Sequence, residues 1–232
     1  MLKNVMCAGL LMAAAGAGSA QLTEISFDRF VQSGVVGGAD SDPVSTITGP
    51  MSGAWNIDHF SSAVDDMNGG SASGYQDSDF GFGAYSGYVD AASSAFGDGA
   101  DIANAFALSH YEFDFLLSGT EDYTLDGFVN AFGEINGEVS EADIRLVDLS
   151  DNSLIHNWSI SNGFEAFDVA GSLPAGSYRF VAEAYTIVNR DFVNGFGDST
   201  ATVNFEMTLT PAPHAVAVLG LAGLGCSIRR RR

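Results

Sequence analysis

Residues 110–117, HYEFDFLL, and residues 201–209, ATVNFEMTL, alternate apolar and polar side chains along their length. A period of two places successive side chains on opposite faces of a strand, so that one face meets a core and the other meets water. The apolar faces consist of Tyr111, Phe113, Phe115 and Leu117 in the first stretch and of Val203, Phe205, Met207 and Leu209 in the second. Both stretches therefore predict strands that each cover one side of a hydrophobic core.

Further strand-like stretches surround these two, and turn-forming pairs such as Asn136-Gly137 and Asn162-Gly163 separate them. They span residues 23–32, 53–60, 122–131, 142–149, 153–160, 164–170 and 177–187. Residues 69–100, rich in Gly, Ser, Asp and aromatics, predict glycine-rich strands joined by wide turns, with a partly disordered loop as the alternative. Short, regularly spaced strands without long helical patterns predict an all-β fold, an antiparallel β-sandwich or jelly roll.

The composition favours one acidic domain, which we expect over residues 21–210 of the 232. This stretch holds all 29 acidic residues against four arginines and no lysine, a formal charge of −25. The arginines are Arg29, Arg145, Arg179 and Arg190. Because such a surface repels phosphates, no nucleic acid partner is expected. Both cysteines, Cys7 and Cys226, lie outside this stretch, so the domain has no disulfide and depends on its hydrophobic core.

The first 20 residues, MLKNVMCAGLLMAAAGAGSA, have the order of a secretory signal peptide. Lys3 supplies a positive charge, an apolar run predicts a short helix, and small residues precede a cleavage site between Ala20 and Gln21. The alternative is a buried N-terminal helix of the domain. We expect export across the inner membrane.

The last 22 residues, PAPHAVAVLGLAGLGCSIRRRR, predict a second targeting segment. Prolines cannot continue a strand, so the last strand is expected to stop at residue 211. The uncharged residues 215–228 would form a helix of about 21 Å, shorter than the roughly 30 Å hydrocarbon core of a membrane. The terminal cluster Arg229, Arg230, Arg231 and Arg232 resists translocation. The segment therefore predicts a weak, transient membrane anchor.

This tail resembles the PEP-CTERM class of bacterial surface proteins, which combine a proline-spaced motif, a short apolar helix and a terminal arginine cluster. The motif here is Pro211, Ala212 and Pro213, with alanine where the class usually has glutamate. The resemblance implies recognition by an exosortase, a membrane-embedded processing enzyme, cleavage near the motif, and release or attachment at the surface of a bacterium that makes exopolysaccharide and biofilm. A plain C-terminal membrane anchor is the alternative.

Part of the core also looks like a secreted β-sandwich that precedes such tails. Residues 172–180, SLPAGSYRF, resemble its recurring hairpin, in which Pro and Gly turn the chain and Tyr178 and Phe180 enter the core. Proteins of this kind mostly have no assigned activity, and the resemblance therefore implies a structural rather than an enzymatic role.

The candidate catalytic residues are the histidines of the domain, His59, His110 and His156, which fall in three separate strand-like stretches. A Ser-His-Asp triad can be assembled from distant residues, but no nucleophile-elbow motif is present. We expect His110 to lie at a strand edge. The sequence predicts no enzyme. An extracellular hydrolase is the third functional hypothesis, after the structural protein and the carbohydrate-binding module described below.

Calcium is the one cofactor for which the sequence offers ligands, because hard oxygen donors are abundant and zinc motifs are lacking. Acidic residues at 40–42, 65–68, 77–79 and 98–101 fall in turn-like stretches. Asp98 and Asp101 are the preferred candidates, since the glycine-containing segment between them can wrap an ion. The alternative is that all of these are solvated acidic turns and that no cofactor binds.

A glycine-spaced run of aromatic residues suggests a platform on which sugars could stack. It comprises Tyr75, Phe80, Phe82, Tyr85 and Tyr88, for which packing in the core is the alternative. The favoured hypothesis is an exported structural protein of the cell surface or extracellular matrix. The alternative is a carbohydrate-binding module for extracellular polysaccharide.

Overall fold

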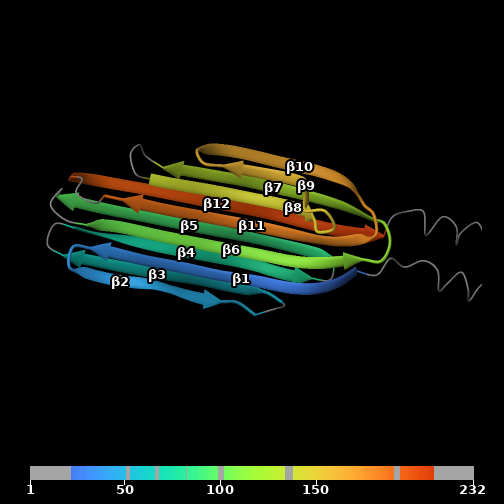
Figure 1. Ribbon diagram of the computed structural model, residues 1–232, viewed down its shortest axis with the longest axis horizontal. Helices are drawn as coiled ribbons and strands as arrows, with labels where there is room; N and C mark the ends of the chain where they lie inside the picture. Colours follow the sequence, from blue (N-terminus) through green and yellow to red (C-terminus); the bar gives the residue numbers. More distant parts are fainter. Residues whose placement is uncertain are drawn as a thin grey trace, which may run out of the picture.

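Two antiparallel sheets of six strands each, packed face to face, make up the protein in the computed structural model (Figure 1). The structure describes residues 22–50, 53–65, 68–81, 83–98, 102–133, 138–190 and 194–211. The predicted all-β antiparallel sandwich is thereby confirmed. The predicted signal helix at 1–20 and Gln21, which follows it, lie outside the described residues. So do residues 212–232 of the tail, which include Ala212, Pro213 and the arginine cluster.

Neighbouring strands of both sheets are antiparallel, with register shifts only between Glu24 and Ser26, between Ser33 and Val35, and between Leu146 and Val147 among the described strands. Sheet A has the order β2 (Asp40–Thr48), β1 (Leu22–Gly37), β6 (Ala103–Leu117), β11 (Gly176–Asn189), β8 (Glu138–Asp148) and β9 (Ser153–Ile160). Sheet B has the order β10 (Gly163–Leu173), β7 (Glu121–Gly133), β12 (Asn194–Pro211), β5 (Ala84–Asp98), β4 (Asn68–Gly81) and β3 (Trp55–Asp65). Each sheet therefore has two edge strands, β2 and β9 in sheet A and β10 and β3 in sheet B.

All of the predicted strands are present, and the glycine-rich stretch forms β4 and β5 as a long hairpin. The predicted wide turn between them is wrong, because residues 82–83 alone connect the strands and Gly83, at φ 72°, supplies the left-handed conformation that a tight turn needs. The acidic residues at 40–42 and 77–79 lie within β2 and β4 rather than in turns. Pairing with neighbouring strands has overridden their preference for turns.

The predicted hairpin at residues 172–180 is also wrong, because β10 belongs to sheet B and β11 to sheet A. Pro174 and Ala175 carry the chain from one sheet to the other, and the Tyr178 hydroxyl donates a hydrogen bond to the Pro174 carbonyl at 2.8 Å. Tyr178 and Phe180 are buried, as expected. The local sequence therefore specifies a turn and its core side chains, but it does not specify whether the two strands pair.

One half of the core is aromatic, at the end where β6 and β12 finish. Phe113 lies at its centre, with its ring centroid 4.2 Å from that of Tyr85 and 5.4 Å from those of Phe115 and Phe180. Phe205 of the opposite sheet packs 4.8 Å from Phe180. All of these rings are at most 2% exposed, so large side chains from both sheets fill the space between the layers.

The other half of the core contains mostly alanine, serine and glycine. Its buried alanines are Ala63, Ala72, Ala91, Ala95, Ala103, Ala105, Ala107, Ala131, Ala142, Ala182, Ala184 and Ala201. At its end the two backbones meet, since a Cβ added to Gly37 of sheet A would lie 2.6 Å from the Cα of Gly69 in sheet B. The core is therefore thick at the aromatic end and thin at the alanine end.

Side chains from β2 cover the exposed edge of β3. Asp42 accepts a hydrogen bond from the backbone N–H of Ser62 at 3.2 Å, and Asp40 accepts one from that of Val64 at 3.3 Å. These are N–H groups that an edge strand would otherwise offer to another chain. The two acids therefore help to close this side of the sandwich.

Both ends of the described fold lie at the aromatic end of the sandwich (Figure 1). Leu22 pairs with Leu117, the last residue of β6, and Pro211 pairs with Glu121, the first residue of β7. The last strand ends at Pro211, as expected. Among the described residues, the structure has no helix that could span a membrane.

Replacing Gly37 by alanine should test the thin half of the core. The added methyl would meet the Gly69 backbone, and we expect the free energy of unfolding to fall by about 2 kcal/mol, as is typical of overpacking. Gly133→Ala is the matched control, since its Cβ would have no neighbour closer than 3.4 Å. Urea unfolding followed by tryptophan fluorescence measures both, and equal effects would contradict a close approach of the sheets.

Candidate functional site

The outward face of sheet B carries a row of polar side chains across five strands, of which four contribute an acid. Asp79 of β4 pairs with Ser86 of β5, which pairs with Glu206 of β12. Glu206 in turn pairs with Asp126 of β7, and Asp126 with Asp168 of β10. Directly opposed carboxylates on neighbouring strands repel one another, so this row costs stability unless a ligand or counter-ions neutralise it.

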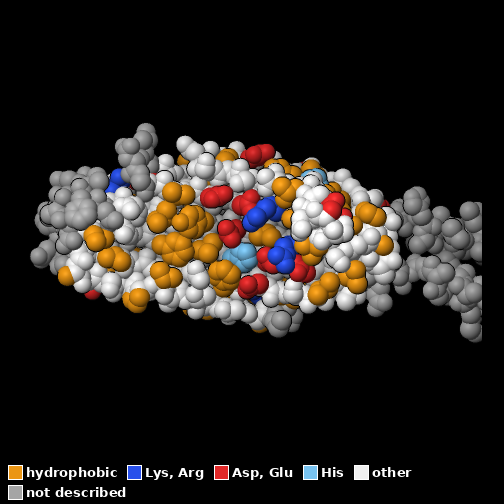
Figure 2. All heavy atoms as spheres, in the orientation of Figure 1, with side chains coloured by type: hydrophobic (Ala, Val, Ile, Leu, Met, Phe, Trp, Pro, Cys, Tyr) orange, Lys and Arg blue, Asp and Glu red, His pale blue; other side chains and the backbone are white. Residues whose placement is uncertain are grey.

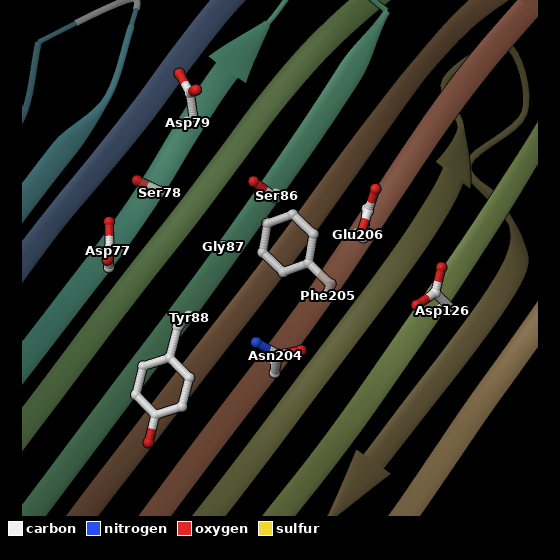
Figure 3. Close-up of a pocket in the computed structure, with 10 residues that line it drawn as sticks. All are labelled: Asp77, Ser78, Asp79, Ser86, Gly87, Tyr88, Asp126, Asn204, Phe205 and Glu206. Atoms are coloured by element: carbon white, nitrogen blue, oxygen red, sulfur yellow. The ribbon is translucent and has the colours of Figure 1, made fainter.

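A shallow groove of about 320 Å³ follows this row (Figure 3). Its lining consists of Asp77, Ser78, Asp79, Ser86, Gly87, Tyr88, Asp126, Asn204, Phe205 and Glu206. The floor is low beside Tyr88 because the next two residues of β5, Ser86 and Gly87, are small. The Phe205 ring fills the space beneath Gly87, where a Cβ would lie 2.6 Å from it. Carboxylates, an amide and one phenol ring thus converge on a surface with a hollow centre.

The face around the groove contains no basic side chain among the outward positions of the described strands. Its carboxylates are Asp58, Asp77, Asp79, Asp90, Asp122, Asp126, Asp168, Asp198 and Glu206. Burial raises the pKa of the Asp90 carboxyl, although the Thr202 hydroxyl donates a hydrogen bond to it at 2.6 Å. Such a surface favours neutral or cationic ligands over anionic ones.

Two tyrosines adjoin the groove. The rings of Tyr75 and Tyr88 are 5.9 Å apart at 64°, and the Asn56 amide donates a hydrogen bond to the Tyr75 hydroxyl at 2.7 Å. Burial, and then the charge of Asp90, raise the pKa of the Tyr88 phenol, which therefore stays protonated at neutral pH. Both rings are half-buried on the outward face.

Of the residues in the predicted aromatic platform, Tyr75 and Tyr88 thus lie on the outward face. Phe80 and Tyr85 are 9% and 1% exposed and belong to the core, because alternation along β4 and β5 turns them inward. Phe82 lies outside the described residues. Sequence reasoning missed the groove residues Asp126 and Glu206, since only the pairing of β7 with β12 brings them together.

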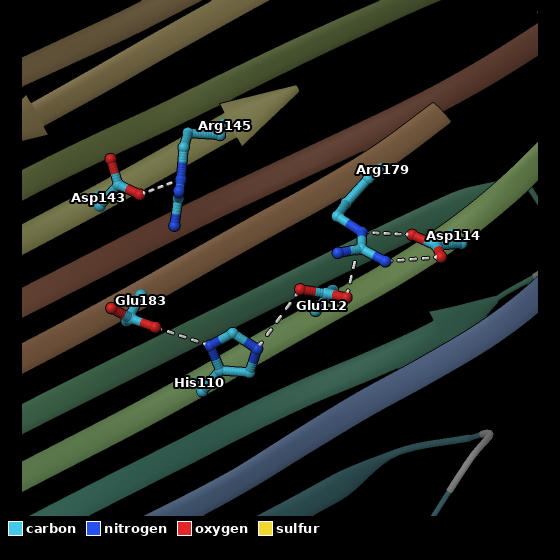
Figure 4. Close-up of polar contacts among 7 residues, drawn as sticks. All are labelled: His110, Glu112, Asp114, Asp143, Arg145, Arg179 and Glu183. Atoms are coloured by element: carbon cyan, nitrogen blue, oxygen red, sulfur yellow. Dashed lines mark hydrogen bonds and ion pairs between the residues drawn. The ribbon is translucent and has the colours of Figure 1, made fainter. Parts of the chain in front are cut away.

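The outward face of sheet A carries a network of paired charges (Figure 4). The Arg179 guanidinium donates two hydrogen bonds to the Asp114 carboxylate, at 2.7 and 2.9 Å, and lies 3.2 Å from Glu112. His110 Nδ1 lies 2.8 Å from Glu183, and Arg145 pairs with Asp143. Unlike sheet B, this face pairs four of its acids with its own basic side chains. The two hydrogen bonds between Arg179 and Asp114 fix both of these side chains.

Burial and pairing move the pKa values of this network in opposite directions. The hydrogen bond from Arg179 lowers the pKa of Asp114, and the hydrogen bond from His110 lowers that of Glu183. Burial raises the pKa of Asp143, although Arg145 opposes the rise. Asp114 and Glu183 therefore stabilise the fold in their ionised form, whereas the ionisation of Asp143 costs stability.

The three histidines do not form one site. His59 lies on β3 with Nε2 2.6 Å from the Ser45 hydroxyl, and His156 lies on β9 with Nε2 2.5 Å from the Tyr123 hydroxyl. His110 lies in β6, which has β1 on one side and β11 on the other, so the expectation of a strand-edge position is wrong. Its ring instead stacks on Phe30 at 4.8 Å. The structure therefore places the three histidines in three separate surroundings.

The predicted calcium site is not tested by the described residues. Asp98 is the last residue of β5, and Asp101 lies outside them. Within the described ranges, no group of three His, Cys, Asp or Glu side chains is arranged to hold a metal ion. Calcium binding at Asp98 and Asp101 therefore stays a prediction.

Comparisons with known proteins give only remote similarities. No family model matches the chain, and no curated protein matches it significantly. The enzymatically active domain of bacteriophage CBA120 tailspike protein 4 is 13% identical at a TM-score of 0.23, over 66% of this chain and 19% of its own length. A structure of infectious bursal disease virus Gt strain is 11% identical at a TM-score of 0.18, over 94% of this chain and 76% of its own. Likenesses this weak carry no argument about function.

The pH dependence of unfolding should reveal the contribution of the Arg179–Asp114 pair to stability. Because the folded-state pKa of Asp114 lies below its unfolded value of about 3.9, the stability it contributes is present above that value and is lost as the pH falls through the folded value. We expect Arg179→Met to lower the free energy of unfolding at pH 7 by about 1 kcal/mol. It should also flatten the decline below about pH 5.

Asp143→Asn is the control, because the pKa of Asp143 is shifted in the opposite direction to that of Asp114. Because the folded-state pKa of Asp143 is raised, its cost is present at neutral pH and is relieved as the pH falls through the folded value. This variant should therefore keep or gain stability at pH 7. Urea titrations between pH 3 and 8 measure both, and parallel pH profiles for the two variants would contradict the assignment.

Proposed function

We propose that this protein is a non-enzymatic, exported structural protein of the cell surface or extracellular matrix. The observation that supports this best is that both ends of the described sandwich lie at its aromatic end. A single tether at that end would leave both broad faces and the alanine end accessible. The strong negative charge keeps such a displayed domain soluble, and its lack of cysteines frees it from oxidative folding.

The two terminal segments, of which the structure describes Pro211 alone, would direct this fate. The signal peptide would be cleaved between Ala20 and Gln21, and the tail motif at Pro211, Ala212 and Pro213 would be read by an exosortase-type enzyme. The apolar segment and Arg229 to Arg232 would hold the chain briefly in the inner membrane until the tail is removed. Because β12 ends at Pro211, cleavage there would leave every described strand intact.

Intact-mass analysis of the native protein from fractionated cells and medium tests this proposal. We expect a mature chain that begins at Gln21 and ends between Pro211 and Pro213. Substituting Arg229 to Arg232 by serine should leave the tail uncut, because the arrest signal is lost. A native protein that keeps these arginines in the membrane fraction would indicate a plain anchor instead.

Carbohydrate binding is the second candidate function, and the groove on sheet B favours it. The ring of Tyr88 offers a stacking surface, while Asn204, Asp77 and Glu206 supply hydrogen-bonding groups around it. Sugar sites typically combine these two kinds of contact. The excess of acids on this face excludes anionic polysaccharides and favours neutral or amino-sugar polymers.

A glycan array with the mature chain tests this second candidate. We expect binding to neutral or amino-sugar polymers, and Tyr88→Ala should weaken it at least tenfold because the stacking surface is lost. Phe132→Ala, at a 53% exposed position on the same face but outside the groove, should bind normally. An absence of binding at millimolar sugar, with and without calcium, would contradict this role.

A further inference from the structure

An apolar patch covers the outward face of sheet A at the alanine end, beside the paired-charge network (Figure 2). Its central row pairs Gly34, Phe106, Ile187 and Val139 across β1, β6, β11 and β8. The neighbouring row toward the aromatic end adds Leu108 and Tyr185. The neighbouring row on the other side adds Val36. Val44 of β2, which is 60% exposed, borders Gly34.

A groove of about 150 Å³ opens between these side chains. It lies between β2 and β11, with Val44, Val36, Phe106 and Ile187 in its walls. The rings of Phe106 and Tyr185 meet edge to face at 5.6 Å, which makes a firm floor beside it. A contiguous apolar surface of this kind on a soluble protein marks an interaction site.

The charge of the protein restricts what can cover this patch. Within the patch Glu141 is the one acid, next to Tyr185, and Asp42 lies at its margin. The neighbouring network pairs its acids with Arg145, Arg179 and His110. The outward face of sheet B carries Phe96, Phe132 and Phe196 at its alanine end, but it has nine carboxylates and no base among the positions that the structure describes, so two copies of this chain would repel each other there. The patch is thus the broad surface on which a second copy meets the least repulsion.

We propose that this patch is the contact between two copies of the chain, packed face to face about a two-fold axis. If the axis runs parallel to the strands, each patch covers its counterpart and both aromatic ends stay on the same side. Two molecules tethered by their tails to one surface would meet in this orientation.

The size of the patch sets the strength of the contact. Five strands spaced by about 4.8 Å and three rows spaced by about 7 Å give roughly 500 Å² per copy. A standard stable interface uses about 800 Å² per partner, so a free pair should be weak and reversible. Tethering to one surface raises the effective concentration and would stabilise the pair without new contacts.

Sedimentation equilibrium of the full chain in dilute detergent, at protein concentrations from about 10 to 500 µM, tests the proposal. Val44→Asp and Val139→Asp should each weaken association at least tenfold, because they bring carboxylates into the apolar contact. Both positions are exposed, at 60% and 45%, so these variants should fold. Phe132→Asp places the same charge on the exposed face of sheet B and should leave association unchanged.

Salt provides an independent readout. Association of two negative molecules through an apolar patch should strengthen between about 20 and 500 mM NaCl, because salt screens their repulsion. A chain that stays monomeric at every salt concentration would overturn the proposal, as would a loss of association in Phe132→Asp equal to that in Val139→Asp. None of these outcomes depends on tail processing or on sugar binding.

The orientation can be measured with a spin label at Leu116→Cys, in a chain whose two native cysteines are replaced by serine. Leu116 is 40% exposed at the aromatic end, ten residues along β6 from Phe106, or about 34 Å. Parallel packing should give a label separation below about 40 Å, whereas antiparallel packing would give roughly 70 Å. The longer distance would overturn the parallel arrangement.

Discussion

The close approach of the two sheets at the alanine end is the constraint on which the rest of the structure depends. Where Gly37 meets Gly69, no large side chain fits between the layers. Bulky residues of this half therefore point outward, as Phe96 and Phe196 do on sheet B and Phe106 and Tyr185 do on sheet A. The exposed apolar surfaces of the protein thus follow from the thinness of its core.

The two broad faces differ in whether their acidic side chains are paired with basic ones. Sheet A pairs its acids with arginines and a histidine, and it concentrates apolar side chains beside them. Sheet B leaves a row with carboxylates on β4, β12, β7 and β10 and a serine on β5, without any base among the outward positions that the structure describes. Charge therefore separates a face suited to another copy of the chain from a face suited to neutral or cationic ligands.

Alternation in HYEFDFLL and ATVNFEMTL was sufficient to predict which side chains enter the core, because burial of one face requires a period of two. The polar positions Asn204 and Glu206 were visible in the same pattern, but the groove they line was not. It depends on β12 lying between β5 and β7, which are distant in the sequence. The passage of the chain from sheet B to sheet A at Pro174 was not predicted for the same reason, and neither was the position of His110 on a central strand. Local sequence does not encode which strands are neighbours.

The position of β12 has a mechanical consequence. It is the longest strand, with 18 residues, and it is hydrogen-bonded on both sides within sheet B. In antiparallel sheets these bonds run perpendicular to the strands. A pull on Pro211 along the strand axis would therefore shear many bonds at once instead of opening them one by one. A chain held by this end would therefore resist unfolding by an applied force.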